Sequence, residues 1–186
     1  PRSGFPFPEA RFLGGEDAAQ AHWAQYLARG LVHGYKASRN GLLGVDYSSK
    51  LSPWFACGAL SPRLVSQQFG AFEAGQGASD GTVWLRFELL WREYFKLLPL
   101  KYGRRLFAAG GLPGREAPLH DAQAFARWMA GDTGHALVDA GMRELAATGY
   151  LGNRMRQIVA SYLIDDLRGD WRAGAAWFES ALIDYD

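Results

Sequence analysis

The 186-residue sequence predicts an all-α protein, and three observations support this prediction. Apolar residues recur at spacings near 3.6 in every long segment, which is the period of an amphipathic helix. The alternation of apolar and polar residues that would indicate a half-buried strand is not found. Gly-rich breaks at 108–114 and 131–134 separate helical segments. Because 48% of the residues are hydrophobic, the chain can build a real core.

The helices follow one another along the chain. Residues 1–15, with three prolines and three glycines, predict an irregular leading segment or linker, and 16–186 are expected to form one helical domain. The first helix is expected from Glu16 through AHWAQYLARGLVHGYK, before the polar SRNGLLGVDYSSK. The pairs Ser52-Pro53 and Ser61-Pro62 each place an N-cap serine before a proline at the first helical position. Further helices are predicted for TVWLRFELLWREYFKLLPL, AQAFARWMA, HALVDAGMRELAAT, NRMRQIVASYLIDDL and DWRAGAAWFESAL.

The composition excludes several classes of protein. Twenty basic and nineteen acidic residues give a net charge of +1, so overall charge does not require a nucleic acid or an anionic membrane as partner. The single cysteine, Cys57, rules out an internal disulfide, and no Cys/His cluster has metal-ligand spacing. The chain shows neither a signal peptide nor a run long enough to cross a bilayer. We expect a soluble, cytoplasmic protein without a metal.

One face of the helix predicted near 153–168 is a candidate ligand-binding surface. It carries Asn153, Arg156, Gln157 and Ala160, beside an apolar stripe formed by Met155, Ile158, Val159, Tyr162 and Leu163. A solvated polar face is the alternative interpretation, but Ala160 and Ile164 make this face only half polar. An arginine and an asparagine one turn apart can donate hydrogen bonds to a planar, electron-rich heterocycle.

A carboxylate shares a helix face with aromatic rings at spacings of four, three and four, in the set Trp84, Glu88, Trp91 and Phe95. A glutamate among aromatics must be hydrogen-bonded, paired or neutral. Pairing with the nearby Arg86 or Arg92 is one interpretation, and recognition of a base-like group is the other.

The segment from Asp46 to Ser52 supplies three serine hydroxyls and a lysine immediately before a predicted helix. Because the first N–H groups of a helix lack intrahelical partners, this segment is a candidate anion site. Serine-rich turns are also common helix caps, so the pattern alone is weak.

Four segments resemble the photolyase and cryptochrome family: SSKLSPWFACGALSPR, FELLWREYFKL, TGHALVDAGMRELAATGYLGNRMRQIVASYLIDDL and DWRAGAAWFESALIDYD. YKASRNGLLGVDYSSKLSPW and FELLWREYF are similar, more narrowly, to its DASH-type cryptochromes. The likeness runs from about Gly14 to Asp186. It implies the helical FAD-binding domain, incomplete at its C-terminus. The resemblance further implies an N-terminal α/β domain that can hold a folate or flavin antenna, and we expect this domain to lie outside the given sequence.

The resemblance also implies a cofactor site. Tyr35 and the run Ser48, Ser49, Lys50, Leu51 and Ser52 would hold the ribityl and diphosphate part of FAD. Arg156 and Asp184 would form an ion pair beside the isoalloxazine ring. Asn153 would lie at the cofactor or lesion edge, and Asp186 would bind toward the ribose. Glu88 and Arg92 are assigned to the cofactor site as well.

Substrate and relay residues follow from the same resemblance. Glu88 and Trp91 match positions that face a damaged pyrimidine pair, with Asn153 beside them. Gln157 stands where duplex-active photolyases usually carry methionine, which favours single-stranded DNA as substrate. Trp171 matches the middle member of the tryptophan relay that reduces the flavin. The outer relay tryptophan would be expected around Pro118, and the sequence ends before the member nearest the flavin.

The implied reaction is that of a deoxyribodipyrimidine photo-lyase, in which light-excited reduced FAD repairs cyclobutane pyrimidine dimers by electron transfer. We expect a monomeric, bacterial-type intracellular flavoprotein that binds damaged DNA. A non-catalytic blue-light receptor is one alternative. Another is a helical nucleic-acid-binding domain without FAD that uses Arg86, Arg92, Arg104 and Arg105 for salt-sensitive phosphate contacts.

Overall fold

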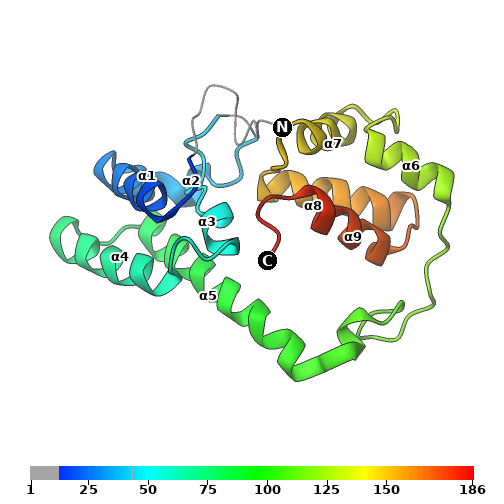
Figure 1. The fold of residues 1–186 in the computed structure, drawn as a ribbon, viewed down its shortest axis with the longest axis horizontal. Helices are drawn as coiled ribbons and strands as arrows, with labels where there is room; N and C mark the ends of the chain where they lie inside the picture. The colour runs from blue at the N-terminus through cyan, green and yellow to red at the C-terminus, as the bar shows by residue number, and fades with distance from the viewer. Residues whose placement is uncertain (1–12, 43) are drawn as a thin grey trace. The chain divides into compact units, whose positions relative to one another are not determined.

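The computed structural model describes residues 13–42 and 44–186 (Figure 1). The all-α prediction is confirmed, because helices and turns account for the regular structure of these residues and none of them forms a strand. The chain divides into two compact units, one running up to Lys96 and including Asp186, the other spanning Leu97–Tyr185. Most of the predicted leading segment, 1–15, lies outside the described residues.

The described residues of the first unit form six helical elements. These are α1 (Glu16–Ala28), the 3₁₀ turn η1 (Leu31–Gly34), α2 (Tyr35–Ser38), α3 (Ser52–Ala56), α4 (Pro62–Gln76) and the first part of α5 (Asp80–Tyr102). The first predicted helix was expected to continue through Lys36, which is wrong. It is interrupted at Gly30, whose φ of 66° is left-handed and ends the regular helical path.

The two Ser-Pro pairs begin helices, but only one does so in the predicted register. Ser61 is the N-cap of α4, and Pro62 is its first residue. In α3 the helix already includes Ser52, and Leu51 occupies the N-cap position. Neither α3 nor α4 has a side-chain hydrogen bond at its cap. The hydroxyl of Ser52 is therefore not consumed by capping.

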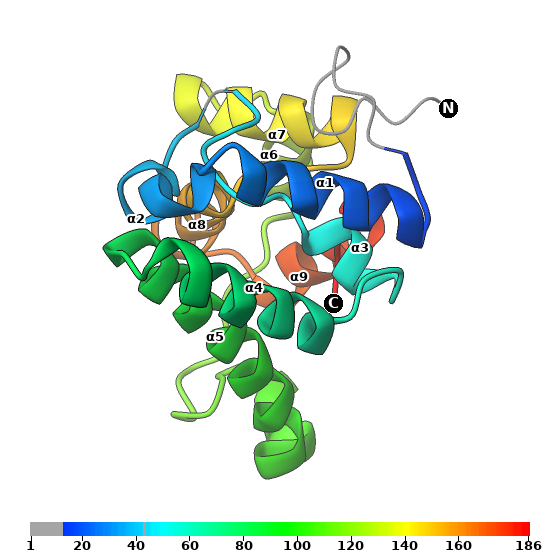
Figure 2. The same ribbon diagram turned by 90° about the vertical axis from the view of Figure 1, so that its left-hand side faces the viewer.

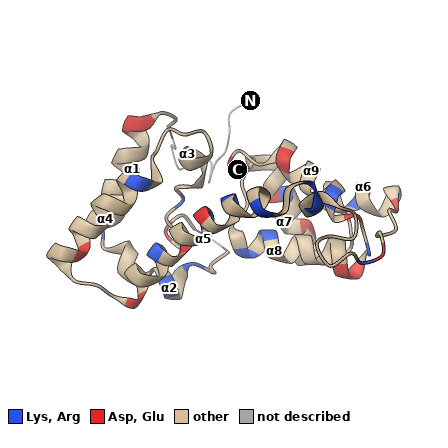
Figure 3. Cartoon of the chain, turned by 90° about the horizontal axis from the view of Figure 1, so that it is seen from below, with Lys and Arg blue, Asp and Glu red and all other residues tan. Residues whose placement is uncertain are grey.

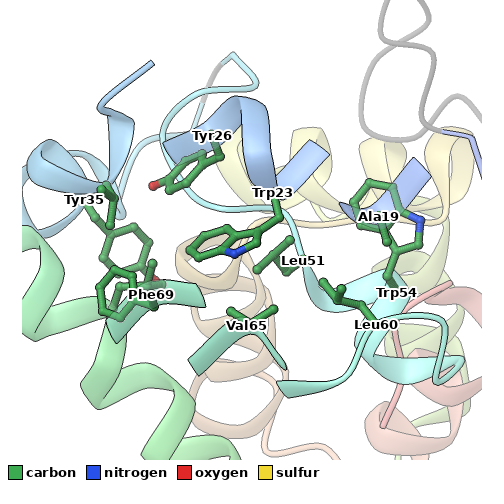
Figure 4. Close-up of a cluster of buried hydrophobic side chains, with 11 residues drawn as sticks. Ala19, Trp23, Tyr26, Tyr35, Leu51, Trp54, Leu60, Val65 and Phe69 are labelled. Carbon is green, nitrogen blue, oxygen red and sulfur yellow. The ribbon is translucent and has the colours of Figure 1, made fainter. Parts of the chain in front are cut away.

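An aromatic core holds the first unit together. Helices α1 and α4 lie side by side (Figures 1 and 2), and Trp23 of α1 fills the space between them with 1% of its surface exposed. Its ring stacks on Tyr26 at 5.9 Å and contacts Phe69 of α4 at 6.2 Å. Figure 4 shows Leu51, which precedes α3, packed close to this tryptophan. The loop that enters α3 is thus anchored in the core.

The second unit contains the 3₁₀ turn η2 (Gly103–Phe107), α6 (Ala122–Ala130), α7 (Ala136–Thr148), α8 (Asn153–Ser161), the π-helical turn η3 (Tyr162–Asp166) and α9 (Trp171–Ala181). The helix predicted from 153 to 167 therefore changes from α to π at Tyr162. Its apolar stripe is confirmed: Met155, Val159 and Leu163 are buried against Trp128 and α7. Trp128 donates from Nε1 to the Val159 carbonyl at 2.9 Å, which joins α6 to α8.

Close approach of two backbone segments at Gly81 gives the first prediction. A Cβ there would meet the carbonyl oxygens of Val32 and His33, whereas one at Gly70, in α4, would meet nothing within 4 Å. Overpacking is expected to lower the free energy of unfolding of Gly81→Ala by about 1–3 kcal/mol. Gly70→Ala should instead gain about 0.5–1 kcal/mol from helix propensity. Urea denaturation of both variants measures this, and equal midpoints would contradict the packing at Gly81.

A second prediction concerns Asp139, at the start of α7. Its carboxylate accepts hydrogen bonds from the Thr133 hydroxyl at 2.6 Å, the Thr133 amide at 2.8 Å and the Gly134 amide at 3.1 Å. The Thr133 hydroxyl is the largest cause that holds the pKa of Asp139 below its ordinary value. The carboxylate therefore contributes fully above the unfolded pKa of about 3.9, and its contribution is lost as pH falls through the lower folded pKa.

Asp139→Asn should be less stable than the parent at neutral pH. Its stability should also fall less steeply on acidification below about pH 4, because the parent gives up a favourable carboxylate there. Thermal melts across an acid pH series provide the measurement. Parallel pH profiles for the two proteins would rule out this role for Asp139.

Candidate functional site

The predicted site residues fall into two sets, one in each unit. The first unit carries Tyr35, Ser48, Ser49, Lys50, Leu51, Ser52, Glu88, Trp91, Arg92 and Asp186. The second unit carries Asn153, Arg156, Gln157, Trp171 and Asp184.

Residues of α1 position the serine-rich loop. The carbonyl of Ser49 accepts a hydrogen bond from Nε2 of His22 at 2.7 Å, which fixes the tautomer with a proton on Nε2. Burial is the main cause that lowers the pKa of His22, so the ring is neutral near pH 7. At the end of α1, Arg29 donates to Asp46 at 2.9 Å. The loop is thereby attached to α1 at two points.

Lys50 has an unusual conformation within this loop. Its φ of 55° lies in the left-handed region, which residues other than glycine seldom adopt. The residue is buried, and its ammonium lies 3.1 Å from the centroid of the Tyr47 ring. A cation so close to an aromatic face keeps a favourable electrostatic contact while it loses water. The loop therefore carries a buried positive charge beside Ser48 and Ser49.

The serine hydroxyls of the loop remain available for a ligand. Among the described residues, no hydrogen bond is made by the hydroxyls of Ser48, Ser49 or Ser52. Hydroxyls both donate and accept, and an ammonium group donates only. The combination of three such hydroxyls with a lysine suits the oxygens of an anion such as a phosphate.

Tyr35, the first residue of α2, is buried in the same unit. Burial raises the pKa of its phenol well above the ordinary value, the negative charge of Glu88 raises it further, and the positive charge of Arg39 opposes the rise. The phenol is therefore a neutral group near pH 7 that can donate or accept a hydrogen bond.

Glu88 is paired, although not with the arginines that the sequence suggested. Arg39, the residue that ends α2, donates from Nη1 to Oε1 of Glu88 at 2.6 Å, and the indole of Trp84 donates to the same oxygen at 3.1 Å. The predicted partner Arg86 instead pairs with Glu73, and Arg92 pairs with Glu93 and Asp186. Arg86, two residues before Glu88, points to another side of α5, whereas Arg92, one turn after it, is taken up by Glu93 and Asp186.

Trp91 lies on an exposed aromatic surface of α5. Its ring is edge-on to Phe87 at 5.7 Å and stacked on Phe95 at 5.5 Å. The indole is 40% exposed, and with Phe87, Leu90 and Tyr94 it lines an apolar pocket of about 390 Å³. Exposed rings with apolar walls are suited to stacking against a planar group.

Arg92 and Asp186 are joined, as their shared assignment to one site requires. Arg92 donates to Asp186 at 2.6 Å, and Lys96 lies 3.8 Å from the same carboxylate. The guanidinium of Arg92 also lies 5.4 Å from the ring centroid of Phe55 in α3.

Arg156 and Asp184 form the predicted ion pair, which lies in the second unit. Nη2 of Arg156 donates to both carboxylate oxygens of Asp184, at 2.8 and 2.7 Å, and Nε donates to the Leu151 carbonyl at 2.6 Å. The side chain of Asp184 is 0% exposed. Nη1 of Arg156 has no hydrogen-bond partner among the described residues, so this guanidinium keeps a donor for a ligand.

Two further contacts, which the sequence did not predict, lie next to this ion pair. The ring of Tyr150 lies 5.4 Å from the guanidinium of Arg156. The amide of Ile183 donates to the Gly149 carbonyl at 2.8 Å, which brings the end of the chain to the start of α8. Neither contact leaves a local sequence pattern.

Asn153 and Gln157 lie on the exposed side of α8. Asn153 is the first residue of the helix, and Gln157 accepts a hydrogen bond from Arg154 at 2.9 Å. Gln157 also lines an open pocket of about 360 Å³ together with His135 and Tyr162. The alternative interpretation, a polar face in contact with solvent, therefore applies to Asn153 and Gln157. Arg156 on the same face instead pairs with Asp184.

Trp171 begins α9 and lines an open pocket of about 750 Å³. Its indole donates to the Ala109 carbonyl at 3.1 Å. Pro118, around which the resemblance predicts the outer relay tryptophan, lines the same pocket. Trp128, the nearby tryptophan in the sequence, is fully buried and bonded to the Val159 carbonyl, so it belongs to the core.

Neither a metal-binding cluster nor a membrane-spanning helix occurs in the described residues. Within 13–42 and 44–186, no group of three or more His, Cys, Asp or Glu side chains could hold a metal ion. No helix of this part of the chain is both long and apolar enough to cross a bilayer.

Comparison with known proteins gives these residues a family context. Residues 84–186 match the family described as "FAD binding domain of DNA photolyase". The chain is 48% identical over 188 residues to Cryptochrome DASH of Xenopus laevis, covering all of this chain and 35% of that protein. It is 50% identical over 177 residues to Cryptochrome DASH of Synechocystis, covering 94% of this chain and 36% of the relative. The chain thus spans about a third of the length of these relatives.

Solved structures agree with the sequence comparison. A Synechocystis cryptochrome superposes with a TM-score of 0.91 at 47% identity, over all of this chain and 40% of that chain. A bacterial class III photolyase from Agrobacterium tumefaciens gives a TM-score of 0.81 at 32% identity, over 95% of this chain and 36% of its own. The helical fold and the matched residues together show that this chain belongs to the photolyase and cryptochrome family and carries its FAD-binding domain.

Proposed function

We propose that the protein is an FAD-dependent photolyase of the DASH type that repairs cyclobutane pyrimidine dimers, preferably in single-stranded DNA. The observation that supports repair most directly is the surface of α5, where a carboxylate with one uncommitted oxygen lies three residues from an exposed tryptophan. A damaged pyrimidine pair offers the complementary groups, polar edges and flat faces.

The residues present fit FAD. The diphosphate would be held by the hydroxyls of Ser48, Ser49 and Ser52 with the ammonium of Lys50, since these groups suit anionic oxygens and the hydroxyls have no other described partner. The neutral phenol of Tyr35 would add a hydrogen bond. Leu51 fixes the loop through its place in the core.

The ring end of the cofactor would be held by the second set. Arg156 would direct its remaining donor to the isoalloxazine edge, while Asp184 keeps the guanidinium in place through two hydrogen bonds. Asn153 would donate or accept at the cofactor or lesion edge, and Asp186, fixed by Arg92, would bind toward the ribose. When bound, FAD supplies light absorption and the one-electron chemistry that splits a cyclobutane ring.

The substrate would enter as an extruded pyrimidine dimer, which consists of two neighbouring bases of one strand. A cyclobutane dimer pairs and stacks poorly, so turning it out of a strand costs less than turning out normal bases. Trp91 would pack against the extruded pyrimidines and Glu88 would accept a hydrogen bond from them. Gln157, already bonded to Arg154, would contact the flanking strand and favour single-stranded DNA. Trp171 would relay electrons that reduce the flavin, from beside an open pocket.

The cofactor proposal predicts an effect of the serine hydroxyls. Ser48→Ala/Ser49→Ala should bind FAD at least about tenfold more weakly, because a hydrogen bond to a charged group contributes about 1.5–3 kcal/mol. Stability should change little, since these hydroxyls have no described partner. Ser66→Ala, on the exposed surface of α4, is the control. Titration of the apoprotein with FAD, followed by flavin fluorescence, measures the affinity, and an unchanged value would refute the phosphate role.

The substrate proposal predicts light-dependent repair that requires Glu88. The reduced intact protein should remove dimers from single-stranded oligonucleotides faster than from duplexes under blue light. Glu88→Ala should keep its flavin but bind the damaged strand about 10–100-fold more weakly. Glu93→Ala, on an exposed position of the same helix, should behave as the parent. Absence of dimer loss with either substrate would eliminate the repair activity.

A further inference from the structure

The hydrogen bonds at Glu88 are distributed unequally between its two oxygens. Arg39 at 2.6 Å and Trp84 at 3.1 Å both donate to Oε1. Among the described residues, Oε2 has no hydrogen-bond partner. Ionised carboxylates accept at both oxygens, so half of the accepting capacity of Glu88 remains available to a group from outside.

Arg39 is itself held in place. Its guanidinium carbon lies 4.9 Å from the centroid of the Trp84 ring, within the range of a cation–π contact. The side chains of Arg39 and Glu88 are 23% and 31% exposed, so the pair is shielded without being buried. Arg39, Trp84 and Glu88 therefore form a closed triangle of contacts, in which each side chain limits the rotation of the other two.

We propose that Arg39 is a positioning residue for Glu88. Together with Trp84 it fixes the carboxylate through Oε1, so that Oε2 accepts an N–H group of a pyrimidine ring. The inference rests on the proposed function, in which Glu88 accepts a hydrogen bond from the extruded pyrimidine dimer. A glutamate that is already fixed loses less side-chain freedom on binding than a mobile one, which strengthens binding without adding a contact to the substrate.

A purely structural role is the competing explanation, and the chain offers a matched control for it. Lys36 and Asp80 join the same two elements, α2 and α5, at 2.8 Å. Figure 3 shows residues of both charges where these elements meet. Lys36 also lies 5.5 Å from the centroid of the Trp84 ring, so Asp80 is the side chain to remove. If the Arg39 pair only braced α2 against α5, removal of Asp80 should have a comparable effect. If Arg39 positions Glu88, removal of Asp80 should leave substrate binding unchanged.

A double-mutant cycle tests the proposal in the dark, with binding as the readout. The intact protein is titrated with a fluorescent dimer-containing single strand and with the undamaged strand, and dissociation constants are obtained from anisotropy. Glu88→Ala and Arg39→Ala should each weaken dimer binding about tenfold. The double variant should be no weaker than the weaker single variant, because Arg39 acts through Glu88. Binding of the undamaged strand should not change, and Asp80→Ala should match the parent.

Other variants separate charge from geometry. Arg39→Lys should restore most of the binding, since an ammonium can still donate to Oε1, whereas Arg39→Gln should not. Trp84→Phe should lose a smaller factor, because it removes one donor and keeps an aromatic ring. Melting temperatures identify any variant that fails to fold. If Arg39→Ala fails to fold, dimer binding by Arg39→Lys and Trp84→Phe tests the positioning role.

Three outcomes would overturn the inference. Additive losses in the double variant, or equal losses for damaged and undamaged strands, would mean that Arg39 contacts DNA phosphate directly. Parent-like dimer binding by Arg39→Ala, while Glu88→Ala is impaired, would refute the positioning role and leave the proposed function standing. A parent protein that does not distinguish damaged from undamaged strands would remove the proposed function and this inference with it.

Discussion

The ion pair between Arg156 and Asp184 is the interaction on which the second unit's part of the site depends. The carboxylate of Asp184 is fully withdrawn from water, and an unpaired charge in that environment would cost several kcal/mol. Two hydrogen bonds from one guanidinium nitrogen meet this cost. The arrangement also fixes Arg156 from one side and leaves a donor on the other. The need to pair the buried carboxylate of Asp184 therefore holds the guanidinium of Arg156 in one orientation on α8.

Two charged groups of the first unit are likewise held by nearby side chains. Glu88 is matched by Arg39 and by the indole of Trp84, and the ammonium of Lys50 is placed over an aromatic ring. At Glu88 the partners leave part of the carboxylate's accepting capacity available, namely Oε2. Groups held in this way are oriented before a ligand arrives, which is the property that binding sites need.

Aromatic packing explains why these groups can be held at all. The core around Trp23 fixes α1, α4 and Leu51, and the serine-rich loop is attached to α1 through His22. On α5 the aromatic residues serve two purposes. Trp84 and Leu85 face the core and its margin, whereas Phe87, Trp91 and Tyr94 remain exposed and form an apolar pocket. One helix thereby provides a structural face and a face suited to planar ligands.

Much of the fold could be predicted from the sequence, because helix periodicity is a local property. The all-α class, the buried stripe of α8 and the start of α4 at Pro62 were all evident, and the resemblance that identified the family rested on local motifs. Interruptions of the helices were less predictable. The break at Gly30 and the π turn at Tyr162 depend on backbone geometry that periodicity does not encode. The resemblance implied that Arg156 pairs with Asp184, and the structure forms this pair across 28 residues. The partner of Glu88 was decided by the tertiary structure alone, because Arg39 meets Glu88 across 49 residues, whereas sequence reasoning favoured Arg86 or Arg92. Side chains three or four residues apart share a helix face, but which distant chain segment covers that face is settled only when the helices pack.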